Sequence, residues 1–166
     1  MADLRALVAS LGHTEVATYI QSGNAVFTPA HADAAALGAE LRTAIAAKLG
    51  VDPAVLVLSR AELADVFSAN PYPDEPKPQY VHAVFLPGEP DAAGRQRLAE
   101  LQSAAAAAGS RDELTLLGRT LYLHTPDGFG NSELAKNLMA KRNSPIAGGT
   151  ARNWATVTKL LAMCDA

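Results

Sequence analysis

The spacing of apolar residues predicts a helix followed by a β-hairpin at the start of the chain. In residues 3–11 the apolar positions recur every three or four residues, which predicts a helix that ends at Gly12. Two β-like runs follow at 16–20 and 25–28. The polar stretch between them contains Gly23-Asn24, and this pair is typical of a tight hairpin turn.

The strongest candidate for a domain boundary is a Pro-rich stretch further along the chain. The stretch NPYPDEPKP has four prolines in nine residues, which predicts a linker over 70–79. We therefore expect a first domain over 1–69 and a second over 80–166. Before the linker, the pattern predicts a long helix, a short apolar strand and a short helix over 33–49, 54–59 and 61–69, respectively.

After the linker, helical and β-like patterns alternate again. The stretch LTLLGRTLYLHTP predicts a hairpin that turns at Gly118-Arg119, and the Gly-rich DGFGNS precedes another helix. The predicted elements, in chain order, are a strand over 80–86, a helix over 90–108, the hairpin, a helix over 132–142, a short strand around 146–151 and a last helix over 153–164.

The order of the predicted helices and strands indicates an α+β protein made of two tandem ferredoxin-like (split β-α-β) units, with antiparallel sheets covered by helices. The second half reads β-α-β-β-α and the first half reads α-β-β-α-β, so both are fragments of the βαββαβ plan. The first half lacks the opening strand of that plan. We expect either that the chain start is truncated or that another segment fills the place, and a partner subunit in a homodimer is one possible source.

The composition and the charge distribution of the chain limit the classes of function that it can have. The chain has 166 residues, of which 49% are hydrophobic and 19% charged, and its net charge of -3 argues against coating nucleic acid through bulk charge. The charge is uneven, because residues 131–166 carry five cations and two acids (+3) and the first 130 residues carry -6. The basic tail is either a solvated helix face or an anion-binding end.

Cysteine and histidine usage gives no sign of a metal centre. Cys164 is the single cysteine, so no internal disulfide forms, and the four histidines show no metal-binding spacing. We therefore expect no metal and no cofactor. The chain shows no signal peptide and no apolar run long enough for a membrane span, so we expect a cytoplasmic protein without membrane contact.

Three stretches together resemble a bacterial family of unknown function, domain of unknown function 1697. They are TYIQSGNAVF (18–27), the GxGxS of Gly128, Gly130 and Ser132, and GTARNWATVTKL (149–160). The resemblance covers essentially the whole chain and implies an α+β fold of two ferredoxin-like halves, but no activity. Members of that family usually begin with an apolar strand and a loop like RGINVGG, which are absent here, in agreement with the missing opening strand.

The polar turn Gln21-Ser22-Gly23-Asn24 is the first candidate site. Ser, Gly and Asn are the residues that a hairpin turn favours, so a structural role explains most of it. Hydrogen-bonding side chains around a glycine could also bind a polar ligand. No acid or histidine is adjacent to Ser22, so a nucleophilic serine has little support.

The second candidate is the Gly-rich loop with the helix that follows it. Gly128 and Gly130 precede a helix start where Asn131 or Ser132 can act as the cap, and Lys136 lies one turn further on. A helix start presents free backbone N–H groups that favour anions. The stretch is neither a Walker A loop nor a dinucleotide-binding motif, so it is either a plain helix cap or a phosphate or carboxylate site.

The third candidate is a polar stripe at the start of the last predicted helix. Asn153, Thr156 and Lys159 are spaced three apart, and Arg152 precedes them. Thr150 or Asn153 can cap that helix. Trp154 has the spacing of a core residue, but two cations beside an aromatic ring also suit ligand binding.

The function that we favour from sequence is the binding of a small anionic or polar molecule between the two halves. The 13 candidate residues above would line that site, and no catalytic residue is assigned. One alternative is a nucleic-acid binding module that uses the basic C-terminal face. Another is a small hydrolase or transferase, in which Ser132, Lys136 and Arg152 hold the phosphate of a metabolite.

Overall fold

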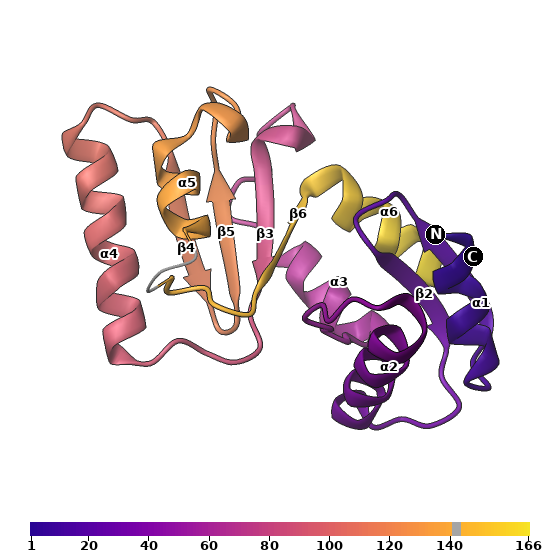
Figure 1. Cartoon of the computed structure of the whole chain (residues 1–166). Helices are drawn as coiled ribbons and strands as arrows, with labels where there is room; N and C mark the ends of the chain where they lie inside the picture. Colours follow the sequence, from indigo (N-terminus) through magenta and orange to yellow (C-terminus); the bar gives the residue numbers. More distant parts are fainter. Residues whose placement is uncertain (141–143) are drawn as a thin grey trace. The chain divides into compact units, whose positions relative to one another are not determined.

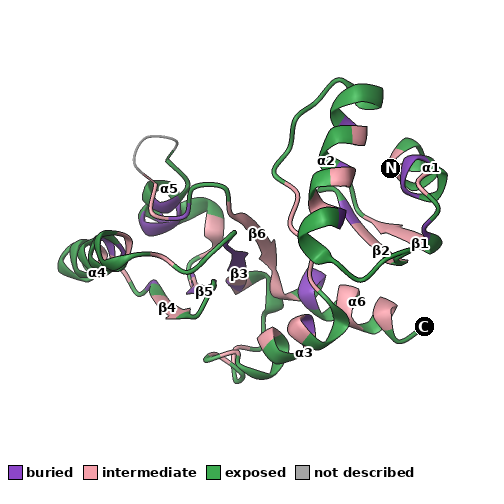
Figure 2. Ribbon diagram, turned by 90° about the horizontal axis from the view of Figure 1, so that it is seen from below, coloured by how far each residue is buried: buried purple, intermediate pink, exposed green. Residues whose placement is uncertain are grey.

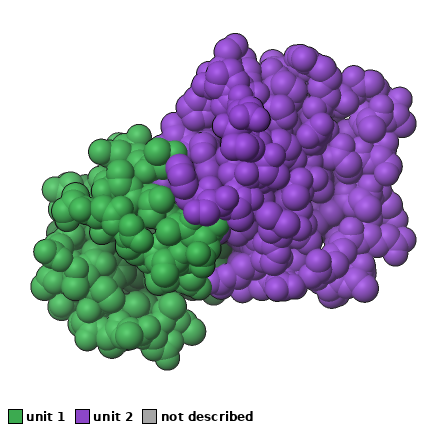
Figure 3. All heavy atoms as spheres, turned by 180° about the vertical axis from the view of Figure 1, so that it is seen from behind, with its two compact units in different colours: residues 1–65, 158–166 green, residues 66–157 purple. Residues whose placement is uncertain are grey.

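The computed structural model describes residues 1–140 and 144–166 (Figure 1). The chain forms two compact units, which are coloured separately in Figure 3. Unit 1 contains Met1–Asp65 and Thr158–Ala166, and unit 2 contains Val66–Val157. The division by compactness therefore falls inside two helices, at residues 60–68 and 154–164, and the domain limits expected from the Pro-rich stretch stay a prediction.

Unit 1 is a small α+β unit around a two-stranded antiparallel sheet. The N-cap Asp33 starts its longest helix, because the carboxylate accepts the N–H groups of Ala35 and Ala36, and Gly50 ends that helix with a φ of 68°. The elements are α1 (Ala2–Ser10), β1 (Thr14–Tyr19), β2 (Asn24–Thr28), α2 (Ala34–Leu49) and most of α3 (Arg60–Ser68). Its buried apolar residues are Leu7, Val8, Leu37, Leu41, Ile45 and Leu63.

The hairpin of unit 1 turns one residue earlier than the sequence indicates. Asn24 belongs to β2 and pairs with Tyr19, so the turn consists of residues 20–23. Its side-chain amide donates to Tyr19 O (3.1 Å) and Ser22 Oγ (2.9 Å), which closes the turn from inside. Ile20 takes a φ of 47°, a conformation that is unusual for a β-branched residue.

The strand expected over 54–59 was a wrong prediction. Residues 51–59 are all described and form no strand, although Val55 to Leu58 are partly buried. An extended apolar run becomes a strand only when a neighbouring strand takes up its backbone groups. In this unit the sheet consists of β1 and β2 alone, so the first ferredoxin-like sheet is not formed as predicted.

Unit 2 contains the βαββαβ order that the sequence predicts for the second half. Its strands and helices are β3 (Val81–Phe85), α4 (Ala92–Ala107), β4 (Glu113–Leu117), β5 (Thr120–His124), α5 (Glu133–Met139) and β6 (Thr150–Asn153). The four strands form one sheet in the order β4-β5-β3-β6, and every neighbouring pair is antiparallel. Gly118, with a φ of 57°, lies in the predicted turn between β4 and β5.

The core of unit 2 lies on one face of this sheet, beneath α4 and α5 (Figure 2). Leu121 and Leu123 of β5 and Leu138 of α5 are completely buried in it. Residues alternate between the two faces of a strand, so Val84, Leu121 and Ala151 share the helix-covered face. The opposite face carries Tyr122, His124 and Arg152.

The last strand and helix differ from the prediction at their junction. The predicted short strand around 146–151 is β6, which starts at Thr150 and continues to Asn153. The last helix, α6 (Trp154–Cys164), follows directly. Arg152 and Asn153 are therefore strand residues that face opposite sides of the sheet, and the single polar stripe expected from helical spacing does not exist.

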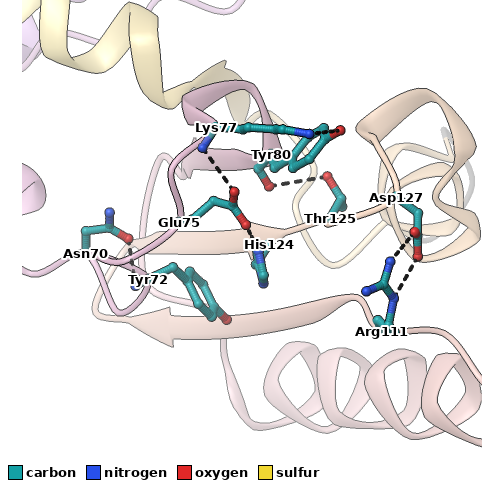
Figure 4. Close-up of polar contacts among 9 residues, drawn as sticks. All are labelled: Asn70, Tyr72, Glu75, Lys77, Tyr80, Arg111, His124, Thr125 and Asp127. Atoms are coloured by element: carbon teal, nitrogen blue, oxygen red, sulfur yellow. Dashed lines mark hydrogen bonds and ion pairs between the residues drawn. The ribbon is translucent and has the colours of Figure 1, made fainter.

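The Pro-rich stretch, expected to be a linker, belongs to unit 2 and packs against its sheet (Figure 4). Tyr72 lies over His124 of β5 with 5.0 Å between ring centroids, and its hydroxyl is 3.1 Å from the Thr115 hydroxyl of β4. Glu75 accepts a hydrogen bond from His124 Nε2 at 2.7 Å. A short 3-10 helix, η1 (Pro78–Tyr80), then leads into β3.

Within residues 1–140 and 144–166, no helix is both long enough and apolar enough to cross a membrane.

Candidate functional site

Two of the stretches that the sequence singles out meet at His82 in unit 2. His82 lies on β3, directly opposite Asn153 of β6 and Leu123 of β5. All three belong to the face that α4 and α5 cover. The ring of Phe129, from the Gly-rich loop after β5, lies against the His82 imidazole with 4.2 Å between centroids. The Gly-rich loop and the Arg-Asn stretch thus converge on one histidine.

The imidazole of His82 has an unsatisfied nitrogen. Its Nδ1 atom is buried and has no hydrogen-bond partner. Burial lowers the pKa of His82 to about 4, because the charged form loses its hydration, so the ring is neutral at physiological pH. A buried polar atom without a partner costs about 1–3 kcal/mol, and such atoms are uncommon in folded proteins. A hydrogen-bonding group placed at Nδ1 would remove this cost.

His82 was missed by the sequence reasoning, although the sequence contains a signal for it. In YVHAVFL the residues around His82 are apolar, and the strand alternation places the histidine on the same face as Val84. A histidine at a core-facing position of a buried strand needs a partner. The pattern alone could not show that the partner is absent, because that depends on which groups the neighbouring strands and loops bring there.

The Gly-rich loop satisfies most of its own polar groups. Residues 129–131 form a 3-10 turn, η2 (Phe129–Asn131), and Gly128 enters it with a φ of 96°. Asn131 uses its side-chain amide to hold Asp127 O at 2.9 Å. Gly130 is exposed, and a side-chain carbon there would meet no other atom within 4 Å. The loop is therefore held in place by its own hydrogen bonds, and its surface is open at Gly130.

Ser132 is the N-cap of α5, as predicted, and it also binds a buried carboxylate. Its hydroxyl oxygen accepts the N–H of Ala135 at 2.8 Å and donates to Asp112 Oδ2 at 2.7 Å. Both residues are buried, at 4% and 5% exposure. An internal carboxylate already lies at the helix start, where the sequence suggested an external anion. The α5 helix is also short, so this cap is structural.

The cations around the loop are paired with neighbouring acids. Lys136 contacts Glu133 at 2.6 Å, and Arg111 forms a two-pronged ion pair with Asp127. The Arg111 guanidinium holds the pKa of the Asp127 carboxyl below its usual value. These pairs leave little net positive charge near Gly128 and Gly130.

The remaining C-terminal candidates have separate environments. Asn153 caps α6, because its side-chain oxygen accepts the N–H of Thr156 at 2.9 Å, and Thr156 is buried instead of lying on a polar surface. Arg152 faces the other side of the sheet, and its guanidinium donates to Thr150 Oγ1 and Ala151 O. Burial lowers the pKa of Arg152. Lys159 is exposed and belongs to unit 1.

The first candidate, Gln21 to Asn24, also belongs to unit 1. Gln21, Ser22 and Gly23 are exposed, whereas Asn24 is buried at 7% exposure and holds the turn together. A binding role for these residues stays a prediction. Two cations of the predicted basic tail, Lys141 and Arg142, lie outside the described residues.

The Tyr72–Glu75–His124 cluster is a structural clamp (Figure 4). Hydrogen bonds from His124 and from the Lys77 backbone lower the pKa of Glu75. The Tyr72 ring covers one face of the His124 imidazole. These groups satisfy one another, so the cluster fastens residues 70–77 to the sheet and leaves no unpaired group that requires a ligand.

A second histidine with a buried, unsatisfied nitrogen, His13, lies in unit 1 near Glu40 and His31. Its Nδ1 accepts the backbone N–H of Ala30 at 3.2 Å, so the proton of the neutral ring is on Nε2. A metal ion at Nε2 would require that proton to move to Nδ1. Over residues 1–140 and 144–166, no group of three or more His, Cys, Asp or Glu side chains is placed to hold a metal ion.

Comparison with known proteins identifies the family. The profile of a family described as "Protein of unknown function (DUF1697)" matches residues 1–122 of the chain. The chain belongs to this family. The DUF1697 match confirms the family and includes the stretch TYIQSGNAVF, whereas the GxGxS stretch and residues 149–160 lie beyond the matched residues. No curated protein matches the chain.

One solved structure supports the fold of this DUF1697 chain. It is a conserved bacterial protein from Streptococcus pneumoniae, with a TM-score of 0.69 and 20% sequence identity. The match covers 99% of this chain and 88% of the other. At this identity the similarity shows the α+β fold alone and says nothing about a ligand.

Proposed function

We propose that this DUF1697 protein binds a small, uncharged polar molecule at the His82 site of unit 2. The observation that carries the proposal is the buried Nδ1 atom of His82, which lacks a hydrogen-bond partner between the Gly-rich loop and Asn153. A ligand group that hydrogen-bonds to Nδ1 removes the cost of that unsatisfied atom, so part of the binding free energy is already present in the unliganded protein.

The charge around the site favours an uncharged ligand over an anion. The His82 ring is neutral, the start of α5 is occupied by Asp112, and Lys136 and Arg111 are paired with acids. A phosphate group needs unpaired cations or free N–H groups, and the site offers little of either. Catalysis of phosphate chemistry and nucleic-acid binding are therefore less well supported than binding alone.

The tandem ferredoxin-like plan also stays a proposal for unit 1. It is supported by the matching orders α1-β1-β2-α2 in unit 1 and α4-β4-β5-α5 in unit 2, each with a hairpin between two helices. The apolar residues 55–58 occupy the same place in the order as β6.

A thermal-shift screen with His82 variants tests the binding proposal. Uncharged amides, sugars and nucleosides are compared with phosphorylated and carboxylated compounds. A ligand at one hundred times its Kd adds about 2.7 kcal/mol to the free energy of unfolding. We expect a hit among the uncharged compounds with the wild type and with Ser103→Ala, which changes an exposed position on α4, but not with His82→Phe.

His82→Phe keeps a ring against Phe129 and removes both nitrogens. Without ligand, this variant is expected to unfold at a higher temperature than the wild type, because a costly unsatisfied atom disappears. Hits restricted to phosphorylated or carboxylated compounds contradict the proposal, and so does equal binding by His82→Phe.

A further inference from the structure

The connection between β2 and α2 in unit 1 is held by very few hydrogen bonds. Residues 29–32 are exposed, and within the described chain no backbone–backbone hydrogen bond involves them. Their one backbone bond to another element is the Ala30 N–H that donates to His13 Nδ1 at 3.2 Å. His13 is buried at 3% exposure and stacks on Phe27 of β2 with 4.8 Å between centroids. A buried imidazole therefore anchors an exposed loop.

This anchor requires the neutral form of His13. Nδ1 must present its lone pair to the Ala30 N–H, so the ring proton is on Nε2. A second proton would have to bind Nδ1, and two N–H groups would then face each other. Protonation of His13 and the hydrogen bond from Ala30 exclude one another.

Glu40 of α2 offers the protonated ring an alternative partner. Its Oε2 atom lies 3.4 Å from His13 Nε2, and no hydrogen bond is formed to that nitrogen in the neutral state. A shift of the imidazolium towards Glu40 would create a charge-assisted hydrogen bond. His31, a residue of the loop itself, already shares a hydrogen bond with the same oxygen at 3.3 Å, so His13 and His31 compete for Glu40.

In the described part of unit 1, His13 forms ring contacts with Phe27 and His31 and lies 3.4 Å from Glu40. From β2 it meets the apolar ring of Phe27. Charged side chains of the adjoining elements are engaged with hydroxyl groups: Arg5 with Thr18, Glu15 with Thr28, and Lys48 with Ser10. Glu40 and His31 are thus the titratable groups that face the ring.

We propose that His13 is a proton-operated latch that holds the loop between β2 and α2 when neutral and releases it when protonated. In the latched state Ala30 is bound to Nδ1. In the released state Nε2–H binds Glu40 and the Ala30 N–H has lost its acceptor, while His31 of the same loop stays within reach of Glu40. Histidine is the side chain that most readily changes charge between pH 5 and 8.

NMR on the full 166-residue chain tests the latch. The ring nitrogens of His13 report its protonation, and hydrogen exchange reports the protection of the Ala30 amide, corrected for the intrinsic rate at each pH. Between pH 8 and 5 we expect Ala30 to lose protection by about fivefold or more, the factor that one such hydrogen bond contributes to local opening. Both signals should change with the same midpoint.

Two variants test whether the pH effect on Ala30 depends on His13 and Glu40. In His13→Asn the side-chain oxygen replaces Nδ1 as the acceptor but does not titrate, so Ala30 should stay protected down to pH 5. In Glu40→Gln the imidazolium loses its anionic partner, so the midpoint should move to lower pH. If His13→Asn does not fold, the Glu40→Gln shift still decides the question.

Three results overturn the proposal. They are a His13 ring that stays neutral down to pH 5, a ring that protonates while Ala30 remains protected, and a midpoint that Glu40→Gln leaves unchanged.

Discussion

At the scale of single residues, the described part of the chain contains two histidines that each have one buried, unsatisfied ring nitrogen. His13 has one nitrogen occupied by Ala30 and the other close to Glu40. His82 has Phe129 against its ring and no hydrogen bond at Nδ1. Both cost stability in the resting protein, and such costs are typical of sites that perform a function.

The low pKa of His82 leads to a stability prediction. Its folded pKa of about 4 lies below the usual value of 6.5, so the unfolded chain binds the proton more strongly. Protonation of His82 therefore leaves the free energy of unfolding unchanged above about pH 6.5 and lowers it as the pH falls from 6.5 towards 4. We expect a loss on the order of 2 kcal/mol after allowance for partial solvent screening.

Urea unfolding at pH 7.5 and pH 4.5 measures this loss. His82→Phe should show a smaller decrease than the wild type over the same interval, because its side chain does not titrate. Parallel decreases in the two proteins would show that other groups cause the pH dependence.

At the scale of elements, caps and turns follow from local chemistry. The Asp33 cap of α2, the Ser132 cap of α5 and the Asn153 cap of α6 all form as the residue types suggest. Ser132 has a second role that its position in the sequence does not reveal, because Asp112 comes from the segment before β4. A cap that also donates a hydrogen bond to a buried carboxylate should contribute more to stability than an ordinary cap.

Ser132→Ala is therefore expected to cost more than the loss of a simple cap. An N-cap contributes about 1 kcal/mol, and an unpaired buried acceptor adds about 1–3 kcal/mol. The matched control is Asp91→Ala, which removes the exposed cap of α4 and nothing else. Chemical denaturation measures both, and equal losses would show that the bond to Asp112 contributes nothing.

At the scale of the whole molecule, each unit has its own buried core. In unit 2 the core is a continuous cluster between the sheet and the helices α4 and α5. Leu138 of α5 is completely buried there, whereas the adjacent Met139 is 38% exposed. Trp154, the single tryptophan, stacks on Phe67 within the same unit, with 5.5 Å between centroids, and provides a fluorescence signal.

Leu138→Ala should lower the free energy of unfolding of unit 2 by about 2–5 kcal/mol, the usual cost of a large cavity in a core. Met139→Ala on the same helix should cost less than about 1 kcal/mol. The shift of the Trp154 fluorescence transition in urea measures both variants. Similar shifts for the two would mean that the cluster around Leu138 is not the stabilising core.

The sequence by itself determined the features that depend on neighbouring residues. The hairpin at Gly118 and the helix caps require only particular residue types at particular positions, and the βαββαβ order of unit 2 follows from them and the apolar periodicity. The family was recognised from short sequence stretches, and the match over residues 1–122, which includes TYIQSGNAVF, confirms the family. In these cases interactions between residues that are close in the sequence are enough to decide the structure.

The tertiary structure alone decided the features that depend on partners from distant segments. Residues 54–59 have the composition of a strand, but a strand also needs a neighbour for its backbone, and the sheet of unit 1 offers none. Asn153 was expected to open a polar stripe on the last helix, with Arg152 just before it, yet pairing with β3 makes both residues the end of a strand. The unsatisfied nitrogen of His82 arises in the same way, because only the packing of β3, β6 and the Gly-rich loop determines which groups come within reach of a buried ring.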